Sequence, residues 1–315
     1  MDLQTRRVYD FFCQRGFLPA DKASYGVFKA HEECSMFQEM SATIIVSWSF
    51  AYNGLYKLIQ GYLCSVYFYE GKPVYFALHR PQKDPECPLD RIIDILYDLS
   101  MEAGLSFLQI KFIEDRSVKD YQNIPGYDIK IESFESDNEY VYRISDLTDL
   151  SGRDNYKKRS RLKKFLSRDD IALVPITRGN IHLCLEIENR WCQGKDCTYC
   201  ASFSGCEKNA MEIMADIFDE HIYYGLIGFY GGAASGYVIC EKRNSGLSCM
   251  YFGKSTVSDF FMYLIYRLAE GYLADCEYMN MNEDMGNLGL RAFKRELSAC
   301  ELWQKNICTL QNRSR

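Results

Sequence analysis

The order of apolar patterns in the second half of the chain restricts the folds that it can adopt. Short apolar runs typical of strands alternate with longer stretches in which apolar residues recur every three or four positions, as on one helix face. The expected elements are strand 171–176, helices 180–191 and 211–218, strands 224–230, 235–240 and 247–252, helix 257–273, strand 277–281, a short helix through 294, and strand 301–310. This order predicts an α/β fold in which a mixed sheet is flanked by helices.

The first half of the chain repeats this order in a looser form. Strands are expected at 43–49, 62–69, 74–79, 105–113 and 127–134, with a helix at 90–103 before the fourth of them. The repeated unit predicts a degenerate internal duplication, with an N-terminal lobe over 1–145 and a C-terminal lobe over 146–315. A length of 315 residues agrees with this division, because it suits two cores of ordinary size.

Composition and charge narrow the class of protein. Hydrophobic residues make up 47% and charged residues 25% of the chain, which is typical of a globular protein. The net charge of −6 argues against DNA binding and leaves room for a local basic patch alone. The sequence has no apolar run of about 18 residues that could span a membrane, and its first residues lack the apolar core of a signal peptide. We therefore expect a cytoplasmic protein whose 14 cysteines are mostly reduced.

Two segments carry longer and more specific patterns. The first joins a Tyr-rich strand that contains Tyr142 to a Leu-Ser-Gly turn and then to a helix rich in Lys and Arg. The second runs from Asn280 to Lys294 and holds Asp284, the two glycines Gly286 and Gly289, and Arg291 at fixed spacing. In both segments the chain resembles the phosphatidylglycerol lysyltransferase C-terminal domain family. The order of elements also resembles that of the GNAT acyltransferase fold.

This resemblance implies two tandem GNAT-like lobes and a transfer reaction. Characterised relatives in the family move an aminoacyl group from aminoacyl-tRNA to a lipid head group, and proteins with the same double lobe build peptidoglycan bridges. The function that the resemblance implies is therefore aminoacyl-tRNA-dependent transfer to an amine or hydroxyl acceptor. Ser160 stands where the family often has Asn, and Asn282 where it often has Glu. Such departures bear on activity more than on fold.

The second segment supplies the candidates for catalysis. Asp284 follows a strand and precedes a helix, where ligands of open α/β sheets gather, and it could accept a proton from an attacking amine or hold an ammonium group. Arg291 and Lys294 share one helix face and could hold a phosphate or a developing oxyanion. The alternative is structural: Asp284 closes the turn or caps the helix, and Arg291 pairs with it.

The substrate contacts are expected over a wider part of the chain. Six cations within 157–164 could bind a tRNA backbone or an anionic head group, although such runs are usually solvated helix faces. Lys254 lies before the long helix, where GNAT enzymes hold the coenzyme A pyrophosphate on a Gly-rich loop; here the loop contains one glycine, Gly253. The candidate substrate-binding residues are Asn280, Glu283, Lys254, Tyr142, Lys158 and Arg159.

Four cysteines that lie close together are candidate metal ligands. Cys192, Cys197, Cys200 and Cys206 have the spacing Cys-x4-Cys-x2-Cys-x5-Cys, and four thiols can hold zinc or an iron–sulfur cluster. Chance clustering among the 14 cysteines is the alternative. A second alternative is a redox pair formed by Cys197 and Cys200.

Three functions remain open at this point. If the protein is an aminoacyltransferase, we expect it to bind charged tRNA with an affinity that falls steeply with salt concentration. If it is an acetyl-coenzyme A-dependent N-acetyltransferase, we expect acetyl-coenzyme A to stabilise the folded protein. If it is a non-catalytic module on a degenerate GNAT fold, we expect it to bind a ligand without turnover.

Overall fold

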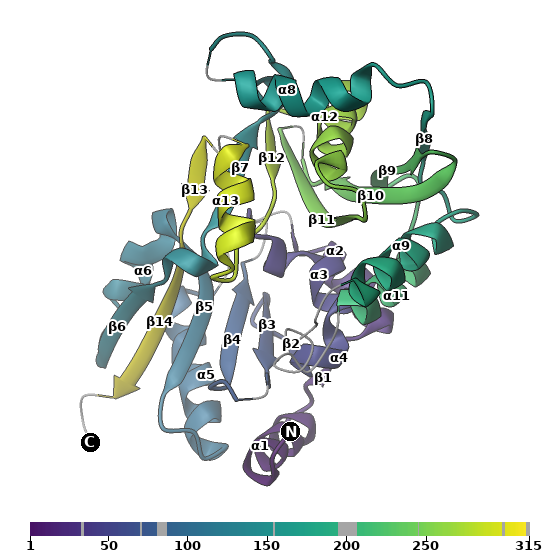
Figure 1. Ribbon diagram of the computed structural model, residues 1–315. Helices are drawn as coiled ribbons and strands as arrows, with labels where there is room; N and C mark the ends of the chain where they lie inside the picture. Colours follow the sequence, from purple (N-terminus) through teal and green to yellow (C-terminus); the bar gives the residue numbers. More distant parts are fainter. Residues whose placement is uncertain are drawn as a thin grey trace. The chain divides into compact units, whose positions relative to one another are not determined.

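The computed structural model describes residues 1–32, 35–69, 71–80, 87–153, 155–194, 207–244, 246–297 and 300–312 (Figure 1). The chain divides into two compact units, Met1–Asn138 with Trp303–Arg315, and Glu139–Leu302. Each unit is built on a seven-stranded mixed sheet with helices on it, which confirms the predicted α/β class. No helix in the described ranges has the length and apolar character that crossing a membrane requires.

The sheet of the first unit has the strand order β1-β2-β3-β4-β5-β14-β6. Its strands are β1 (Leu18–Pro19), β2 (Leu55–Ile59), β3 (Tyr62–Tyr67), β4 (Tyr75–His79), β5 (Leu108–Glu114), β6 (Tyr127–Ser133) and β14 (Lys305–Asn312). Its α-helices are α1 (Leu3–Gln14), α2 (Tyr25–Lys29), α3 (Ala42–Ser47), α4 (Ser49–Tyr52), α5 (Leu89–Glu102) and α6 (Val118–Gln122). The strands pair antiparallel except β4 and β5, which run parallel and share the single register pair Phe76↔Ile110.

The strand expected at 43–49 is wrong, because this segment forms α3 and the start of α4. Its β-branched residues favour a strand by propensity. The Ser41 side chain, however, accepts a hydrogen bond from the Ile44 amide at 3.2 Å, which is the geometry of a helix N-cap. Every residue of α3 is buried, so tertiary packing outweighs the local preference.

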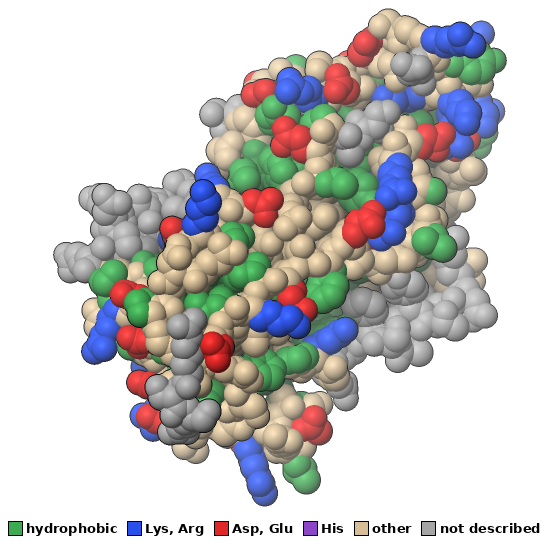
Figure 2. All heavy atoms as spheres, turned by 90° about the vertical axis from the view of Figure 1, so that its left-hand side faces the viewer, with side chains coloured by type: hydrophobic (Ala, Val, Ile, Leu, Met, Phe, Trp, Pro, Cys, Tyr) green, Lys and Arg blue, Asp and Glu red, His purple; other side chains and the backbone are tan. Residues whose placement is uncertain are grey.

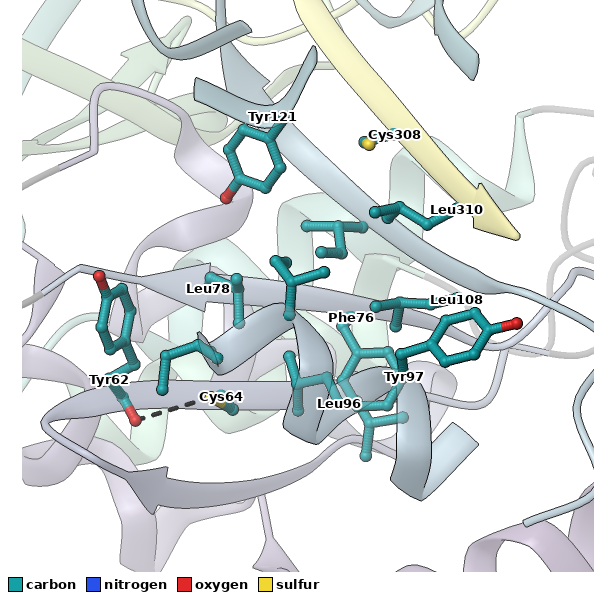
Figure 3. Close-up of a cluster of buried hydrophobic side chains, with 14 of the residues drawn as sticks. Tyr62, Cys64, Phe76, Leu78, Leu96, Tyr97, Leu108, Tyr121, Cys308 and Leu310 are labelled. Atoms are coloured by element: carbon teal, nitrogen blue, oxygen red, sulfur yellow. Dashed lines mark hydrogen bonds between the residues drawn. The ribbon is translucent and has the colours of Figure 1, made fainter. Parts of the chain in front are cut away.

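The core of the first unit lies between the sheet and α5 (Figure 3). Ile92, Ile93 and Leu96 recur at helical spacing on α5 and are fully buried. Cys308 and Leu310, from the last strand of the chain, reach the same cluster as Leu96 and Leu108. Since burying one such aliphatic side chain contributes roughly 1.5–3 kcal/mol, β14 is part of what holds this unit together.

The sheet of the second unit has the strand order β13-β7-β12-β11-β10-β9-β8. Its strands are β7 (Glu139–Arg143), β8 (Ile171–Pro175), β9 (Tyr223–Tyr230), β10 (Ala233–Lys242), β11 (Leu247–Ser255), β12 (Tyr278–Asn280) and β13 (Glu301–Trp303). Its α-helices are α7 (Ile144–Thr148), α8 (Tyr156–Leu166), α9 (His182–Gln193), α11 (Glu207–Ile217), α12 (Phe260–Tyr272) and α13 (Leu288–Glu296). The element order expected from the second half of the sequence is therefore confirmed up to α13, whereas the single strand expected at 301–310 is divided into β13 and β14, which belong to different sheets.

Helices cover both faces of this second sheet. Val238 of β10 packs in the same core as Phe260 and Leu264 of α12, whereas the next residue along the strand, Tyr237, reaches α9. Neighbouring strand residues point to opposite faces, so α12 and α9 lie on opposite sides of β10. Gly228 of β9 lets α12 approach closely, since a Cβ there would lie 2.6 Å from the Phe260 ring.

Two strands belong to a different unit from the one expected when the chain is divided between residues 145 and 146. β7 pairs with β12 in the sheet of the second unit, and β14 lies between β5 and β6 in the sheet of the first. The second unit is therefore the contiguous stretch Glu139–Leu302, and the first unit consists of Met1–Asn138 with the C-terminal segment Trp303–Arg315. Periodicity locates a strand along the chain, but its partner depends on long-range packing that the pattern does not contain.

Candidate functional site

In the second sheet, the parallel strands β11 and β12 stop pairing early. Among the described residues their ladder consists of three pairs, Leu247↔Tyr278, Ser248↔Met279 and Cys249↔Asn280, although β11 continues to Ser255. Opposite β10, the register of β11 skips Tyr251, which marks a bulge. A bulge bends its strand and disrupts the ladder there. The carboxyl ends of these two strands are therefore the place in this unit where a ligand would meet unpaired backbone.

Lys294, predicted to be catalytic, holds the loop that follows β12. Its ammonium group donates hydrogen bonds to the carbonyl oxygens of Met281 at 2.8 Å and Asn282 at 2.9 Å, and to that of Glu283. An ammonium group has three donors, and these three carbonyls match them. Lys294 is 4% exposed, so this geometry favours a structural role over contact with a phosphate.

Asp284, the predicted proton acceptor, is fully buried and saturated with hydrogen bonds. Its carboxylate accepts from Arg291 Nε at 2.7 Å and Nη2 at 3.0 Å, from the Tyr140 hydroxyl at 2.7 Å and from the Gly286 amide at 2.8 Å. Burial alone would raise the pKa of Asp284, but the hydrogen bonds from Arg291 and Tyr140 bring it down to about 2. So acidic a group is a weak base at neutral pH, and the geometry favours the structural alternative for both Asp284 and Arg291.

The polar side chains of the Asn280–Lys294 segment hold the same loop, which explains why they recur at fixed spacing. The Asn280 side chain accepts a hydrogen bond from the Asn282 amide at 2.8 Å and donates one to Glu139. Asn282 has φ of 64°, a left-handed conformation that Asn adopts more easily than most residues. The buried Tyr142 hydroxyl donates to the Lys294 carbonyl oxygen at 2.8 Å. Asn280 and Tyr142 thus belong to the scaffold beneath the loop.

The basic helix α8 uses most of its charges within the protein. Buried Lys158 donates to the Asp146 carbonyl oxygen at 3.0 Å, and its burial lowers its pKa. Arg159 donates to the carbonyl oxygens of Leu150 and Gly152. Two further cations of this helix form ion pairs with acidic side chains: Arg161 with Glu296 and Lys164 with Asp259.

Lys157 and Lys163 are the members of the run that stay exposed without an ion pair among the described residues. Figure 2 shows one face of the molecule, on which basic and acidic side chains are interspersed. The structure therefore reduces the six-cation run to a smaller exposed charge than the sequence indicates.

A buried polar cluster that the sequence analysis missed lies on the α9 side of β10 and β11. Glu188 of α9 is fully buried, and its Oε1 accepts a hydrogen bond from the Tyr237 hydroxyl. Lys254 forms an ion pair with Glu207 and lies 4.6 Å from the centre of the Trp191 ring. In the described part of the chain, Glu188 Oε2 has no hydrogen-bond partner.

The electrostatics of this cluster differ from those of Asp284. Burial raises the pKa of Glu188 to about 7, and the nearby Glu207 adds to the rise while Lys254 opposes it. Burial also works against the charge of Lys254, but Glu207 and Glu188 hold its pKa above the usual value. A carboxyl group that titrates near neutral pH can both accept and release a proton under physiological conditions.

The fold brings these residues together through strand register and helix periodicity. Tyr237 and Lys254 are cross-strand partners in β10 and β11, so both point to the face that α9 covers. Glu188 lies on the buried face of α9 with Cys184, one helical turn away, and Ile187. A charged residue among apolar positions of one helix face is the sequence signal that could have identified Glu188.

The start of α12 bears on the coenzyme A hypothesis. Asp259 is the residue before α12, and its carboxylate forms ion pairs with Lys164 at 2.9 Å and with Arg161 at 3.7 Å. Among the described residues this carboxylate makes no capping hydrogen bond to the first amides of α12, because it faces the two cations of α8. The coenzyme A hypothesis therefore depends on the loop before the helix, which contains one glycine, Gly253.

The predicted metal site cannot be placed. Cys192 lies in α9, while Cys197, Cys200 and Cys206 lie outside the described residues. Within the described ranges, no group of three or more His, Cys, Asp or Glu side chains could hold a metal ion.

The fold of the described residues and a family model lead to the same classification of the chain. The described architecture, mixed sheets flanked by helices, is the predicted GNAT-like fold. The family model described as phosphatidylglycerol lysyltransferase, C-terminal, matches residues 51–298, which is more than half of the chain. The chain belongs to this family. Among curated proteins, no sequence matches it.

Solved structures resemble the chain over nearly its whole length. A conserved protein of unknown function from Bacteroides thetaiotaomicron has 20% identity and a TM-score of 0.82, over 94% of this chain and 99% of that one. L-PGS from Bacillus licheniformis has 13% identity and a TM-score of 0.64, over 95% and 94%. FemX has 10% identity and a TM-score of 0.59, over 91% and 95%. At these identities the likeness concerns the fold.

Proposed function

We propose that the chain is an acyltransferase that moves an aminoacyl group from aminoacyl-tRNA to an amine or hydroxyl acceptor, at the carboxyl ends of β11 and β12. The observation that carries this proposal is the buried Glu188–Tyr237 pair beside Lys254, next to the bulged strand β11. A carboxyl group with a pKa near 7 suits proton removal from an acceptor. The family supplies the class of reaction, since its description names a lysyltransferase.

In the proposed step, the acceptor nitrogen or oxygen attacks the carbonyl carbon of the aminoacyl ester. The new bond joins the acceptor to that carbon, and the bond to the ribose oxygen of the tRNA breaks. Glu188 takes the proton that the acceptor loses and passes it to the leaving ribose oxygen. Lys254 contributes positive charge beside the developing oxyanion.

The signature residues have a positioning role in this account. Asp284, Arg291 and Lys294 fix the loop after β12, which follows the strand that separates from β11. Asn280, Glu283 and Tyr142 then act mainly through the shape of this loop. A zinc ion at the cysteine cluster and direct tRNA contact by Lys158 or Arg159 stay predictions.

The loop before α12 favours an aminoacyl donor over acetyl-coenzyme A. It contains one glycine, Gly253, where GNAT enzymes hold the coenzyme pyrophosphate on a Gly-rich loop. A tRNA donor places no pyrophosphate there. If acetyl-coenzyme A nevertheless stabilised the protein and supported acetyl transfer, the second candidate function would replace the first.

A transfer assay with a conservative pair of variants tests the proposal. Purified protein is mixed with radiolabelled aminoacyl-tRNA and phospholipid vesicles, or with small amines and alcohols, and transfer of the label is followed against pH. Glu188→Gln keeps the size of the side chain and should lower the transfer rate at least 100-fold. Glu186→Gln, on the exposed face of the same helix, is the matched control and should leave the rate unchanged. Equal rates in the two variants would remove Glu188 from the reaction.

A further inference from the structure

Glu188 is a buried carboxyl group whose negative charge the described residues leave uncompensated. It is fully buried, and its Oε1 accepts the hydrogen bond from the Tyr237 hydroxyl. In the described part of the chain its Oε2 has no hydrogen-bond partner. Lys254, the cation that acts on it electrostatically, forms its ion pair with Glu207. An unpaired buried charge is costly, so either a proton or a bound cation compensates this carboxylate.

The surroundings of Glu188 already hold one primary ammonium group, that of Lys254. Its Nζ pairs with Glu207 and lies 4.6 Å from the centre of the Trp191 ring. Burial works against the charge of Lys254, but Glu207 and Glu188 hold its pKa above the usual value. Carboxylates and aromatic faces are the groups that attract an ammonium. With Glu188 ionised, this cluster of described residues has two carboxylates and one ammonium, so one negative charge has no counter-ion.

The cluster reaches the protein surface through its other members. The side chains of Lys254 and Glu207 are 17% and 33% exposed. Glu188 and Trp191 are three residues apart on α9 and share a face of that helix. A small ligand that approaches past the ion pair of Lys254 and Glu207 can therefore meet the Glu188 carboxyl group.

From these features we infer that Glu188 Oε2 binds the primary ammonium group of the acceptor, so that the acceptor of the transfer reaction is an amine and not an alcohol. The inference rests on the proposed function, because it chooses between the two acceptor classes that the proposal leaves open. An ammonium group supplies the positive charge that the cluster lacks. A hydroxyl group supplies a hydrogen-bond donor without a charge, and neutral hydrogen bonds are weaker than charge-assisted ones.

The protons of an ammonium acceptor balance as follows. The bound ammonium first gives one proton to Glu188, which releases it to water, and this frees the lone pair of the nitrogen. The nitrogen then attacks the ester carbonyl carbon, and its second proton moves through Glu188 to the leaving ribose oxygen. The products are an amide, a free ribose hydroxyl and one proton in solution.

Thermal unfolding of the full chain tests binding without tRNA, with propylammonium chloride and 1-propanol as probes of similar size. Propylammonium should raise the Tm as its concentration increases, whereas 1-propanol, and sodium chloride at the same ionic strength, should not. Each variant is compared with its own Tm without ligand. Glu188→Gln should abolish the rise, and Glu186→Gln, on the exposed face of the same helix, should respond as the wild type does.

The rise in Tm should grow between about pH 6 and about pH 8. Burial raises the pKa of Glu188 to about 7, so the carboxylate that binds the ammonium forms within this range, while an alkylammonium, with a pKa of about 10, stays charged. Tyr237 and Cys184 stay protonated, because burial raises the pKa of both, and the remaining neighbours are the paired Lys254 and Glu207. A rise that is the same at both pH values would contradict binding at Glu188.

A transfer assay with labelled aminoacyl-tRNA and the same two probes tests the choice of acceptor. Amines react faster than alcohols without a catalyst, so each rate is divided by the rate without protein. This enhancement should be at least about tenfold larger for propylamine, and mild alkali should leave its amide product intact while hydrolysing an ester product.

The two arms separate this inference from the proposed function. Equal or greater enhancement with 1-propanol would overturn the inference and leave the proposed function standing. Transfer to neither probe, with propylammonium binding that is lost in Glu188→Gln, would overturn the proposed function and leave the ammonium site standing. Propylammonium binding that is absent, or unchanged in Glu188→Gln, would overturn the inference.

Discussion

Asp284 and Glu188 are buried carboxyl groups in the same unit with opposite protonation behaviour. Asp284 is surrounded by donors, and its pKa is about 2. Glu188 receives one hydrogen bond, from Tyr237, and shares its surroundings with a second acid, Glu207, so its pKa is about 7. The first is a fixed charge that holds a loop, and the second can exchange its proton near neutral pH.

The raised pKa of Glu188 predicts a pH dependence of stability. Between its ordinary pKa of 4.5 and about 7, the folded protein keeps a proton that the unfolded chain has lost. The free energy of unfolding should therefore fall as pH rises through this window. Denaturant titrations of wild type and Glu188→Gln should show this fall in the wild type and a flatter dependence in the variant. Parallel curves would show that Glu188 does not titrate in this range.

The buried pair between Asp284 and Arg291 predicts a large cost on its removal. Asp284→Asn leaves a guanidinium without its charged partner, which should cost roughly 3–5 kcal/mol of unfolding free energy. Asp275→Asn removes the 69%-exposed partner of Lys242 and should cost far less, because exposed ion pairs contribute little to stability. Thermal unfolding of both variants measures the difference, and a cost below about 1 kcal/mol for Asp284→Asn would contradict the structural role.

At the scale of elements, the loop between β12 and α13 is held from both of its ends. The Lys294 ammonium group binds three carbonyl oxygens of the loop, and Asn287 caps α13 by accepting from the Leu290 amide at 3.0 Å. Asn282 and Met285 have positive φ values within the loop. The shape of this loop therefore depends on backbone conformations as much as on side-chain contacts.

The positive φ of Asn282 gives a prediction on backbone strain. Asn282→Val should cost roughly 1–2 kcal/mol from the left-handed conformation alone, whereas Asn282→Gly should cost less because Gly adopts this φ freely. Denaturant titration of the two variants gives the comparison. If Val were tolerated better than Gly, the loop would not have the conformation described.

Sequence patterns located most elements but not all of their partners. The repeated strands and helices of the second half stand where periodicity places them, whereas 43–49 forms α3 because Ser41 caps it. The Asn280–Lys294 segment was found by its motif, but the chemistry of Asp284 depends on Tyr140, which is 144 residues away. Glu188 became a candidate once its contact with Tyr237 was known, because burial and pKa follow from tertiary contacts.

At the scale of the whole molecule, the first unit is built from both ends of the chain. β14 lies inside the first sheet, with β5 on one side and β6 on the other. Removing it leaves two unpaired strand edges and takes Cys308 and Leu310 from the core. The second unit is the contiguous stretch Glu139–Leu302, whereas the first unit is not contiguous and cannot be excised by a single cut.

Truncation after residue 302 should therefore unfold the first unit. Hydrogen exchange at β5 and β6 should become fast, and exchange at β9 and β10 of the second unit should change less. A peptide that contains Lys305–Asn312, added in excess, should restore part of the protection. Unchanged protection of β5 and β6 in the truncated chain would contradict the described position of β14.

The central claim is that the donor is an aminoacyl-tRNA. The most direct measurement is the affinity of the full chain for aminoacyl-tRNA with an amide-linked amino acid, compared with uncharged tRNA and acetyl-coenzyme A at two salt concentrations. The account predicts tighter binding of the charged tRNA, weakening steeply with salt, and no binding of acetyl-coenzyme A. Equal affinity for charged and uncharged tRNA, or binding of acetyl-coenzyme A alone, would contradict it.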